Sequence, residues 1–132
     1  MLIARSHLQR LVVTLGDPAG VGPEVTEKAL QLFCREEPDA AIILVGPSNS
    51  AEEMQTRLNL AQVSVFPLDR FDGRIGLPTA ESGRLSLEAL NAAIRMCKTD
   101  MADAIVTAPI SKHALALAGS DDRGHTEILA RQ

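Results

Sequence analysis

The 132-residue chain has no tryptophan or tyrosine, and its three phenylalanines leave aromatic residues at only 2% of the sequence. Proteins that bind single-stranded nucleic acid stack bases on aromatic side chains and contact the phosphates with clustered lysine and arginine. This chain has no basic run, and its 13 basic residues are outnumbered by 17 acidic ones. We therefore exclude nucleic acid as a partner, and a membrane surface for the same electrostatic reason.

The sequence also lacks an apolar run as long as a membrane span, and residues 1–10 lack the apolar core of a signal sequence. It has only two cysteines, Cys34 and Cys97, and two isolated thiols form neither a disulfide framework nor a zinc knuckle. We expect both thiols to be reduced and buried, and the protein to be cytoplasmic. Its 45% apolar and 23% charged residues are typical of a globular protein.

Short apolar runs alternate with helical patterns along the chain. Continuous apolar, β-branched runs predict buried strands at residues 11–15 and 41–45, and shorter runs predict two further strands at residues 63–66 and 104–107. Helical periodicity predicts helices at residues 23–34, 50–60, 81–98 and 111–117, with another beginning near residue 124. This alternation indicates an α/β fold with a largely parallel sheet and flanking helices, whose functional loops lie at the carboxyl ends of the strands.

Two details of these helices can be compared directly with a structure. In the first helix, we expect the inner face to consist of Val25, Ala29, Leu32 and Phe33. In the second, Ser50 and Glu53 have the spacing of a capping box, which predicts that the helix starts there.

The strongest local motif is the loop GDPAGVGPE at residues 16–24, between the first strand and the first helix. Small residues let the backbone approach a ligand, and the start of the following helix offers unpaired N–H groups to an anion. The motif is not a dinucleotide fingerprint, since Val25 stands where the third glycine is needed, nor a P-loop, since Val21 follows Gly20. A ligand-binding loop and a tight turn without a ligand both remain open.

Two later segments also carry polar residues. Residues 107–112 (TAPISK) follow the fourth strand, and Lys112 is either a charge partner for a substrate phosphate or carboxylate, or an exposed lysine. In residues 121–127 (DDRGHTE), the candidate side chains are either ligands of a divalent cation or part of an acidic loop that caps a helix, namely Asp121, Asp122, His125 and Glu127. The histidine there could instead bind an anionic or hydroxylated substrate. His7 and His113 receive no role.

Taken in order, residues 16–24, 107–112 and 124–127 resemble the 4-hydroxythreonine-4-phosphate dehydrogenase family of the vitamin B6 pathway, over nearly the whole chain. Isocitrate and isopropylmalate dehydrogenases carry a similar glycine loop, but the GHTE segment after the TAPISK loop favours the narrower family. The resemblance implies part of an isopropylmalate-dehydrogenase-like fold. It also implies a homodimer that uses NAD and a divalent metal (zinc, magnesium or cobalt) to oxidise and decarboxylate 4-phosphooxy-L-threonine, giving 3-amino-2-oxopropyl phosphate.

In that family the histidine and threonine of the GHTE segment contact the substrate, which implies substrate-binding roles for His125 and Thr126. The family's metal-binding histidines, its later substrate contacts and most of its nicotinamide site lie beyond this segment. No helix stop signal follows Ala130. We therefore expect residues 1–132 to be the N-terminal portion of a longer two-domain dehydrogenase, without metal ligands and inactive alone. Catalytic and cofactor-binding residues stay unassigned.

Two alternatives remain open from the sequence. Paralogues of the family act on other sugar-acid phosphates such as D-threonate 4-phosphate, or on cis-dihydrodiol carboxylates, and no residue of this chain discriminates among these substrates. The chain could also be a self-contained, non-catalytic α/β module that binds a phosphorylated metabolite. A sharp melting transition that phosphorylated hydroxy acids raise and a chelator leaves unchanged would favour this module.

Overall fold

A computed structural model of the chain describes residues 9–132, so the predictions for the first eight residues, His7 among them, lie outside the described part. The elements are, in order, β1 (Arg10–Thr14), α1 (Gly22–Glu36), β2 (Ala41–Pro47), α2 (Ser48–Leu58), β3 (Val63–Leu68), α3 (Ala80–Lys98), β4 (Ala104–Thr107), α4 (Lys112–Leu117) and α5 (His125–Ala130). The four strands form one parallel sheet, which confirms the predicted α/β class. Between residues 9 and 132, no helix is both long enough and apolar enough to cross a bilayer.

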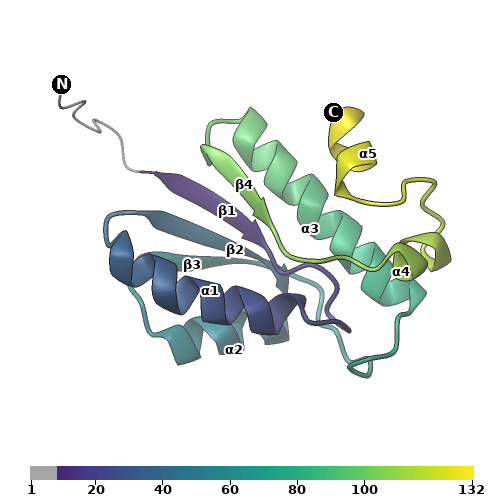
Figure 1. The fold of residues 1–132 in the computed structure, drawn as a ribbon, viewed down its shortest axis with the longest axis horizontal. Coiled ribbons are helices and arrows are strands. Elements are labelled where there is room, and N and C mark those ends of the chain that lie inside the picture. Colours follow the sequence, from purple (N-terminus) through teal and green to yellow (C-terminus); the bar gives the residue numbers. More distant parts are fainter. Residues whose placement is uncertain (1–8) are drawn as a thin grey trace.

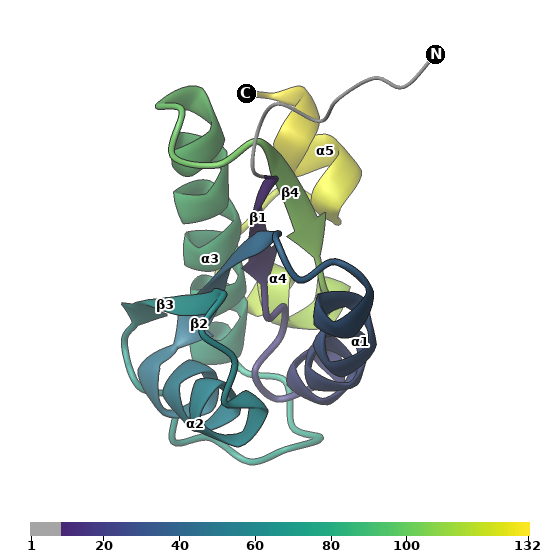
Figure 2. The ribbon, with the colours of Figure 1, turned by 90° about the vertical axis from the view of Figure 1, so that its left-hand side faces the viewer.

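The sheet lies between two layers of helices (Figures 1 and 2). Helices α1 and α2 cover one face, where Leu30 of α1 and Met54 of α2 pack with Leu44 of β2. Helix α3 covers the other face, where its alanines pack closely on Val12 of β1. Each large apolar side chain buried in this way contributes about 1.5–3 kcal/mol to the free energy of folding.

The order of the strands locates the edge of the sheet that is suited to a ligand. The sheet has the order β3-β2-β1-β4, so the chain adds strands on one side of β1 and then returns to add β4 on the other. Ligands of open parallel sheets bind at such a reversal, outside the carboxyl ends of the strands. In Figure 1 the arrowheads of β1 and β4 point toward α4, which places their following loops at this position.

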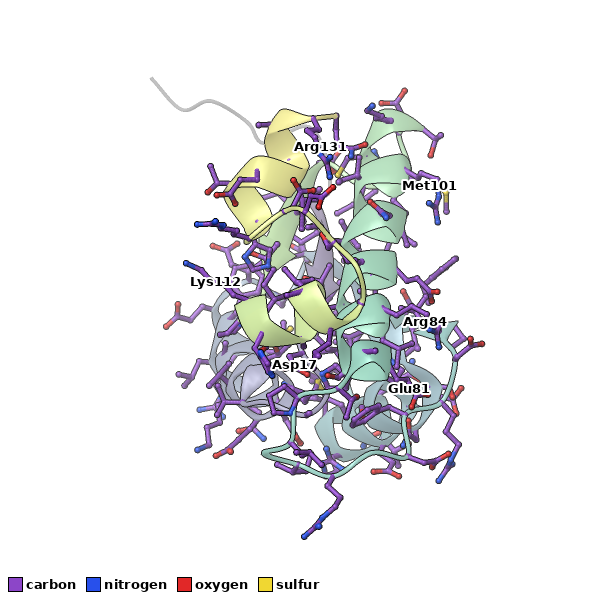
Figure 3. The ribbon with its side chains drawn as sticks, turned by 90° about the vertical axis from the view of Figure 1, so that its right-hand side faces the viewer. Asp17, Glu81, Arg84, Met101, Lys112 and Arg131 are labelled. Atoms are coloured by element: carbon purple, nitrogen blue, oxygen red, sulfur yellow. The ribbon has the colours of Figure 1, made fainter. Side chains whose placement is uncertain are left out.

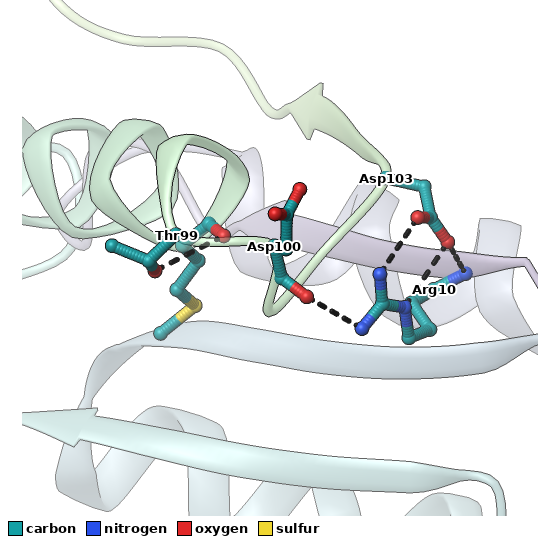
Figure 4. A network of polar contacts seen from close by, with 5 residues as sticks. Arg10, Thr99, Asp100 and Asp103 are labelled. Atoms are coloured by element: carbon teal, nitrogen blue, oxygen red, sulfur yellow. Dashed lines mark hydrogen bonds and ion pairs between the residues drawn. The ribbon is translucent and has the colours of Figure 1, made fainter.

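A polar network joins β1 and β4 at the opposite end of the sheet (Figure 4). The Arg10 guanidinium donates hydrogen bonds to the Asp103 carboxylate at 2.8 and 3.2 Å, and to the carbonyl oxygen of Asp100 at 2.6 Å. The hydrogen bond to Asp103 raises the pKa of Arg10. Because both side chains are well exposed, this ion pair contributes little stability and acts mainly to align the two strands.

The predicted inner face of α1 is wrong for Val25, Ala29 and Leu32, which are exposed, whereas Phe33 is half-buried and packs against the core, as the sequence predicts. Val25 and Leu32 are 43% and 63% exposed. The buried positions of α1 are instead Gly22, Thr26, Leu30 and Cys34. Because these positions are four residues apart, they form a narrow stripe that packs on the sheet. The apolar residues of α1 beside this stripe face β4 across a cavity.

The predicted capping box is also wrong. Helix α2 begins at Ser48, directly after β2, and no side chain caps it. The capping box opens α3 instead, where the N–H of Ser82 donates to Oγ1 of Thr79 at 3.1 Å and the N–H of Thr79 donates to Oγ of Ser82 at 2.9 Å. Ser50 cannot cap α2 because the direct connection from strand to helix places it inside the helix.

Both cysteines lie in helices, as the sequence predicts, and both are free thiols. Cys34 of α1 is buried in the hydrophobic core, whereas Cys97 of α3 is only half-buried. Burial raises the pKa of both thiols, so each stays protonated and a poor nucleophile near neutral pH.

Candidate functional site

The loops that follow β1 and β4 are fastened to each other by backbone hydrogen bonds. The N–H of Asp17 donates to the carbonyl oxygen of Pro109 at 3.0 Å, and the N–H of Ala108 donates to that of Thr14 at 3.1 Å. Gly16 has a φ of +72°, and a Cβ there would lie 2.2 Å from the Pro109 oxygen. Glycine is therefore required at this position both by its conformation and by the close approach of the second loop.

Other contacts of the glycine loop are also internal. The buried Asp17 side chain accepts a hydrogen bond from the N–H of Ala19 at 2.8 Å, which closes a tight turn. A Cβ on Gly22 would lie 2.1 Å from the carbonyl oxygen of Leu15, so α1 starts in contact with the end of β1. These contacts explain the small residues of the motif as a turn that positions the loop after β4.

The TAPISK segment turns directly into α4. Oγ of Ser111 accepts a hydrogen bond from the N–H of Ala114 at 3.1 Å and so caps the helix. Helix α3 fixes the position of α4, since a Cβ on Gly83 would lie 2.0 Å from the carbonyl oxygen of Ala114. Lys112 is the first residue of α4, and Figure 3 shows it between α4 and α5.

The GHTE segment forms the start of α5, which packs on α3 and α4 through the buried Ile128. An ion pair between Asp122 and Arg131 joins the residues on either side of this helix. The cation interpretation of this segment finds no support, because residues 9–132 contain no group of three His, Cys, Asp or Glu side chains placed to hold a metal ion.

The two segments meet in one open pocket of about 380 Å³. It is lined by Pro109 and Ile110 of the loop after β4, by Lys112, and by residues 123–127. The structure therefore brings Lys112 together with His125 and Thr126, three residues that the sequence singles out separately. The glycine loop is hydrogen-bonded to the loop after β4 and so helps to position it, but no residue of the glycine loop lines this pocket.

Arg123 also lines the pocket, and sequence reasoning gave it no role. Lys112 and Arg123 supply two positive charges, and Glu127 supplies one negative charge. Within residues 9–132 none of these three side chains forms an ion pair. The pocket thus offers unused charges to a small, charged ligand.

His125 is the most unusual group of the pocket. Its Nε2 atom is buried and has no hydrogen-bond partner in the part of the chain that the structure describes. A buried polar atom without a partner costs about 1–3 kcal/mol, and such atoms mark places where a ligand can supply the missing bond. Burial lowers the pKa of His125, so its ring is neutral near pH 7 and can either accept or donate a hydrogen bond.

We expect His125 to titrate below the ordinary histidine range and to make the folded chain less stable in acid. The unfolded chain takes up the proton near the ordinary pKa of about 6.5, whereas the folded chain takes it up only at lower pH. Between these values the unfolded state binds more protons, so stability falls as the pH drops below about 6.5. An NMR titration, with the signal identified by its loss in His125→Gln, measures this pKa, and a value at or above the ordinary range would contradict the burial.

A second cavity, of about 360 Å³, lies between α1 and β4. Val25, Ala29 and Phe33 of α1 face Val106 of β4 across it, and Pro109 borders both cavities. Its lining is apolar apart from two threonines, so it offers no charged group to a substrate. The sequence contains a signal for this cavity, because the α1 residues that line it are among the apolar residues that helical periodicity predicts to lie inside.

Comparison with known proteins shows which family this chain matches. The family model described as "Pyridoxal phosphate biosynthetic protein PdxA" matches residues 9–132. A 4-hydroxythreonine-4-phosphate dehydrogenase of Synechocystis sp. is 42% identical over 95% of this chain and 39% of its own length. A D-threonate 4-phosphate dehydrogenase of Salmonella typhimurium is 32% identical over 91% of this chain and 42% of its own length.

The solved structures agree with the fold. The crystal structure of a 4-hydroxythreonine-4-phosphate dehydrogenase from Burkholderia phymatum matches 95% of this chain and 43% of its own chain, with a TM-score of 0.82 and 26% identity. The chain spans about two fifths of the length of the relatives it matches, so a large part of each relative has no counterpart in these residues.

Proposed function

Because the chain belongs to the PdxA family of pyridoxal phosphate biosynthetic proteins, we propose that the protein carrying it oxidises 4-phosphooxy-L-threonine at its 3-hydroxyl group. The product loses carbon dioxide to give 3-amino-2-oxopropyl phosphate, for pyridoxal phosphate biosynthesis. We propose NAD as the hydride acceptor, a divalent metal (zinc, magnesium or cobalt), and a cytoplasmic homodimer. The names of the relatives support the dehydrogenase activity and the phosphorylated hydroxy-amino-acid substrate.

One structural observation carries this proposal. The pocket at the carboxyl end of the sheet combines a threonine hydroxyl with two cations that form no ion pair, and a buried histidine nitrogen that has no hydrogen-bond partner, among residues 9–132. A small molecule with an anionic phosphate and hydrogen-bonding hydroxyl groups satisfies all of these at once. In this proposal His125 and Thr126 bind and orient the substrate, and Lys112 balances its negative charge.

The described residues do not fit a metal centre, because no group of three potential ligand side chains occurs among them. We therefore place the ligands of the proposed metal outside residues 9–132, and we assign none of these residues to NAD. On this basis residues 1–132 form the N-terminal portion of a two-domain dehydrogenase. They contribute substrate orientation, and the chain alone does not turn over.

The direct test is the formation of NADH by the protein that carries this chain, supplied with 4-phosphooxy-L-threonine, NAD and a divalent metal. We expect sustained NADH formation there and none from the isolated chain. Failure of the complete protein to oxidise any phosphorylated hydroxy acid would overturn the proposed function. Turnover by the isolated chain would overturn the placement of the metal ligands outside it.

A second candidate substrate is D-threonate 4-phosphate, which the name of the Salmonella typhimurium relative supports. The two substrates differ at carbon 2, where threonate carries a hydroxyl group in place of the ammonium group. Glu127 favours the amino acid, because its unpaired carboxylate lies in the pocket and can pair with an ammonium group. Comparing kcat/KM for the two compounds decides between them. Binding without any NADH formation would favour the non-catalytic module instead.

A further inference from the structure

We propose that Arg123, together with Lys112, binds the phosphoryl group of the substrate, and that Arg123 selects phosphorylated over unphosphorylated hydroxy acids. This inference rests on the proposed function, and it names the part of the substrate that this end of the pocket receives. Arg123 is thereby a specificity-determining residue that the sequence pattern alone does not reveal.

The geometry leaves the Arg123 guanidinium available for a ligand. Its sequence neighbour Asp122 is buried and already paired with Arg131, the residue that follows the last turn of α5. Glu127 lies in the same pocket, yet no ion pair joins its carboxylate to Arg123 within residues 9–132. Gly124, in an extended conformation, separates Arg123 from His125.

Most arginines of the described chain are used differently. Five of them form ion pairs with a carboxylate, namely Arg10, Arg57, Arg70, Arg84 and Arg131. Among residues 9–132, Arg123 forms none, as is also true of Arg35, Arg74 and Arg95, but of these four arginines it is the one that lines this pocket, which Lys112 also lines. Both side chains are exposed where they line this pocket, so an anion bound there can be attracted by both cations.

The charge balance favours a phosphoryl group over a carboxylate. A phosphate monoester carries a charge of about −1.5 to −2 near pH 7, whereas a carboxylate carries −1. The pocket's two cations match the larger charge, since Glu127 can be occupied by the ammonium group of the same substrate. The planar guanidinium of Arg123 can contact two phosphate oxygens, and Lys112 adds a point charge.

The test measures binding by calorimetry at one fixed ionic strength, because salt screens exposed charges. The probes are 4-phosphooxy-L-threonine, 4-hydroxy-L-threonine and inorganic phosphate, and the protein is the one that carries this chain. We expect Arg123→Gln to weaken the affinity for 4-phosphooxy-L-threonine by about tenfold or more. The same variant should change the affinity for 4-hydroxy-L-threonine by less than about twofold. Lys112→Gln should act in the same direction, and Arg123→Lys should restore part of the affinity.

Arg95→Gln is the matched control, since it removes the same charge from an exposed arginine of α3 that does not line this pocket. Unchanged affinity for 4-phosphooxy-L-threonine in Arg123→Gln would overturn the inference and leave the proposed function standing. Equal losses for both threonine compounds would also overturn it, because they indicate a structural effect. If Arg123→Gln weakens binding of inorganic phosphate but 4-phosphooxy-L-threonine does not bind at all, the anion site is supported and the proposed function is wrong.

Discussion

Replacing His125 by alanine should lower kcat/KM for 4-phosphooxy-L-threonine by about 10- to 100-fold in the protein that carries this chain. The buried Nε2 atom has no partner in the described residues, and we propose that the substrate supplies one. A hydrogen bond to a charged ligand is worth about 1.5–3 kcal/mol, which corresponds to this range of rate constants. The loss should be larger than for any other single residue of the pocket, because His125 is the one group there whose polar atom is buried and unsatisfied.

His113→Ala is the matched control, because His113 is an exposed histidine that does not line the pocket. We expect it to leave kcat/KM unchanged. His125→Asn, which keeps a hydrogen-bonding side chain, should recover part of the activity. If His125→Ala folds normally, as judged by circular dichroism, and retains full activity, His125 does not belong to the site.

Replacing Gly16 by alanine should destabilise the fold by about 3 kcal/mol or more. Its φ of +72° alone costs a residue with a side chain about 1–2 kcal/mol. The new Cβ would also lie 2.2 Å from the carbonyl oxygen of Pro109, an overlap that backbone movement alone can relieve. Such movement would separate the loops after β1 and β4, so binding of the phosphorylated substrate should weaken together with stability.

Gly76→Ala separates the two contributions. Gly76 has a φ of +86°, but a Cβ there would have no atom within 4 Å. We expect this variant to lower the free energy of unfolding, measured in urea, by about 1–2 kcal/mol, which is the conformational contribution alone. Binding of the phosphorylated substrate should be unchanged. Equal losses of stability in the two variants would show that the contact with Pro109 does not hold the loops together.

Much of this arrangement follows from the sequence. The runs of β1 and β2 are continuous, apolar and mostly buried, whereas β3 and β4 are the edge strands of the sheet and are largely exposed. All four strands nevertheless lie within a few residues of their predicted positions. Parallel strands carry their following loops at one edge of the sheet, which predicts that the segments after β1 and β4 lie near each other. The structure confirms this, and it brings His125 and Thr126 to Lys112.

The remaining features depend on tertiary contacts that periodicity does not report. Val25 and Leu32 look like core residues in the sequence, but α1 turns a neighbouring stripe toward the sheet, namely Gly22, Thr26, Leu30 and Cys34. Ser50 has the spacing of a helix cap, but the direct passage from β2 into α2 leaves no turn for it to cap. Arg123 lies in the DDRGHTE segment, but the sequence assigns it no role, and the packing of α5 against α3 and α4 brings it to the pocket.

The central claim is that the phosphorylated substrate binds between the loop after β4 and the start of α5. Hydrogen–deuterium exchange of the protein that carries this chain, measured with and without 4-phosphooxy-L-threonine, tests this claim most directly. We predict slower exchange in peptides that cover residues 109–112 and 123–127, and no change in the peptide that covers residues 25–33. Protection confined to residues 25–33, in the groove between α1 and β4, would contradict the account.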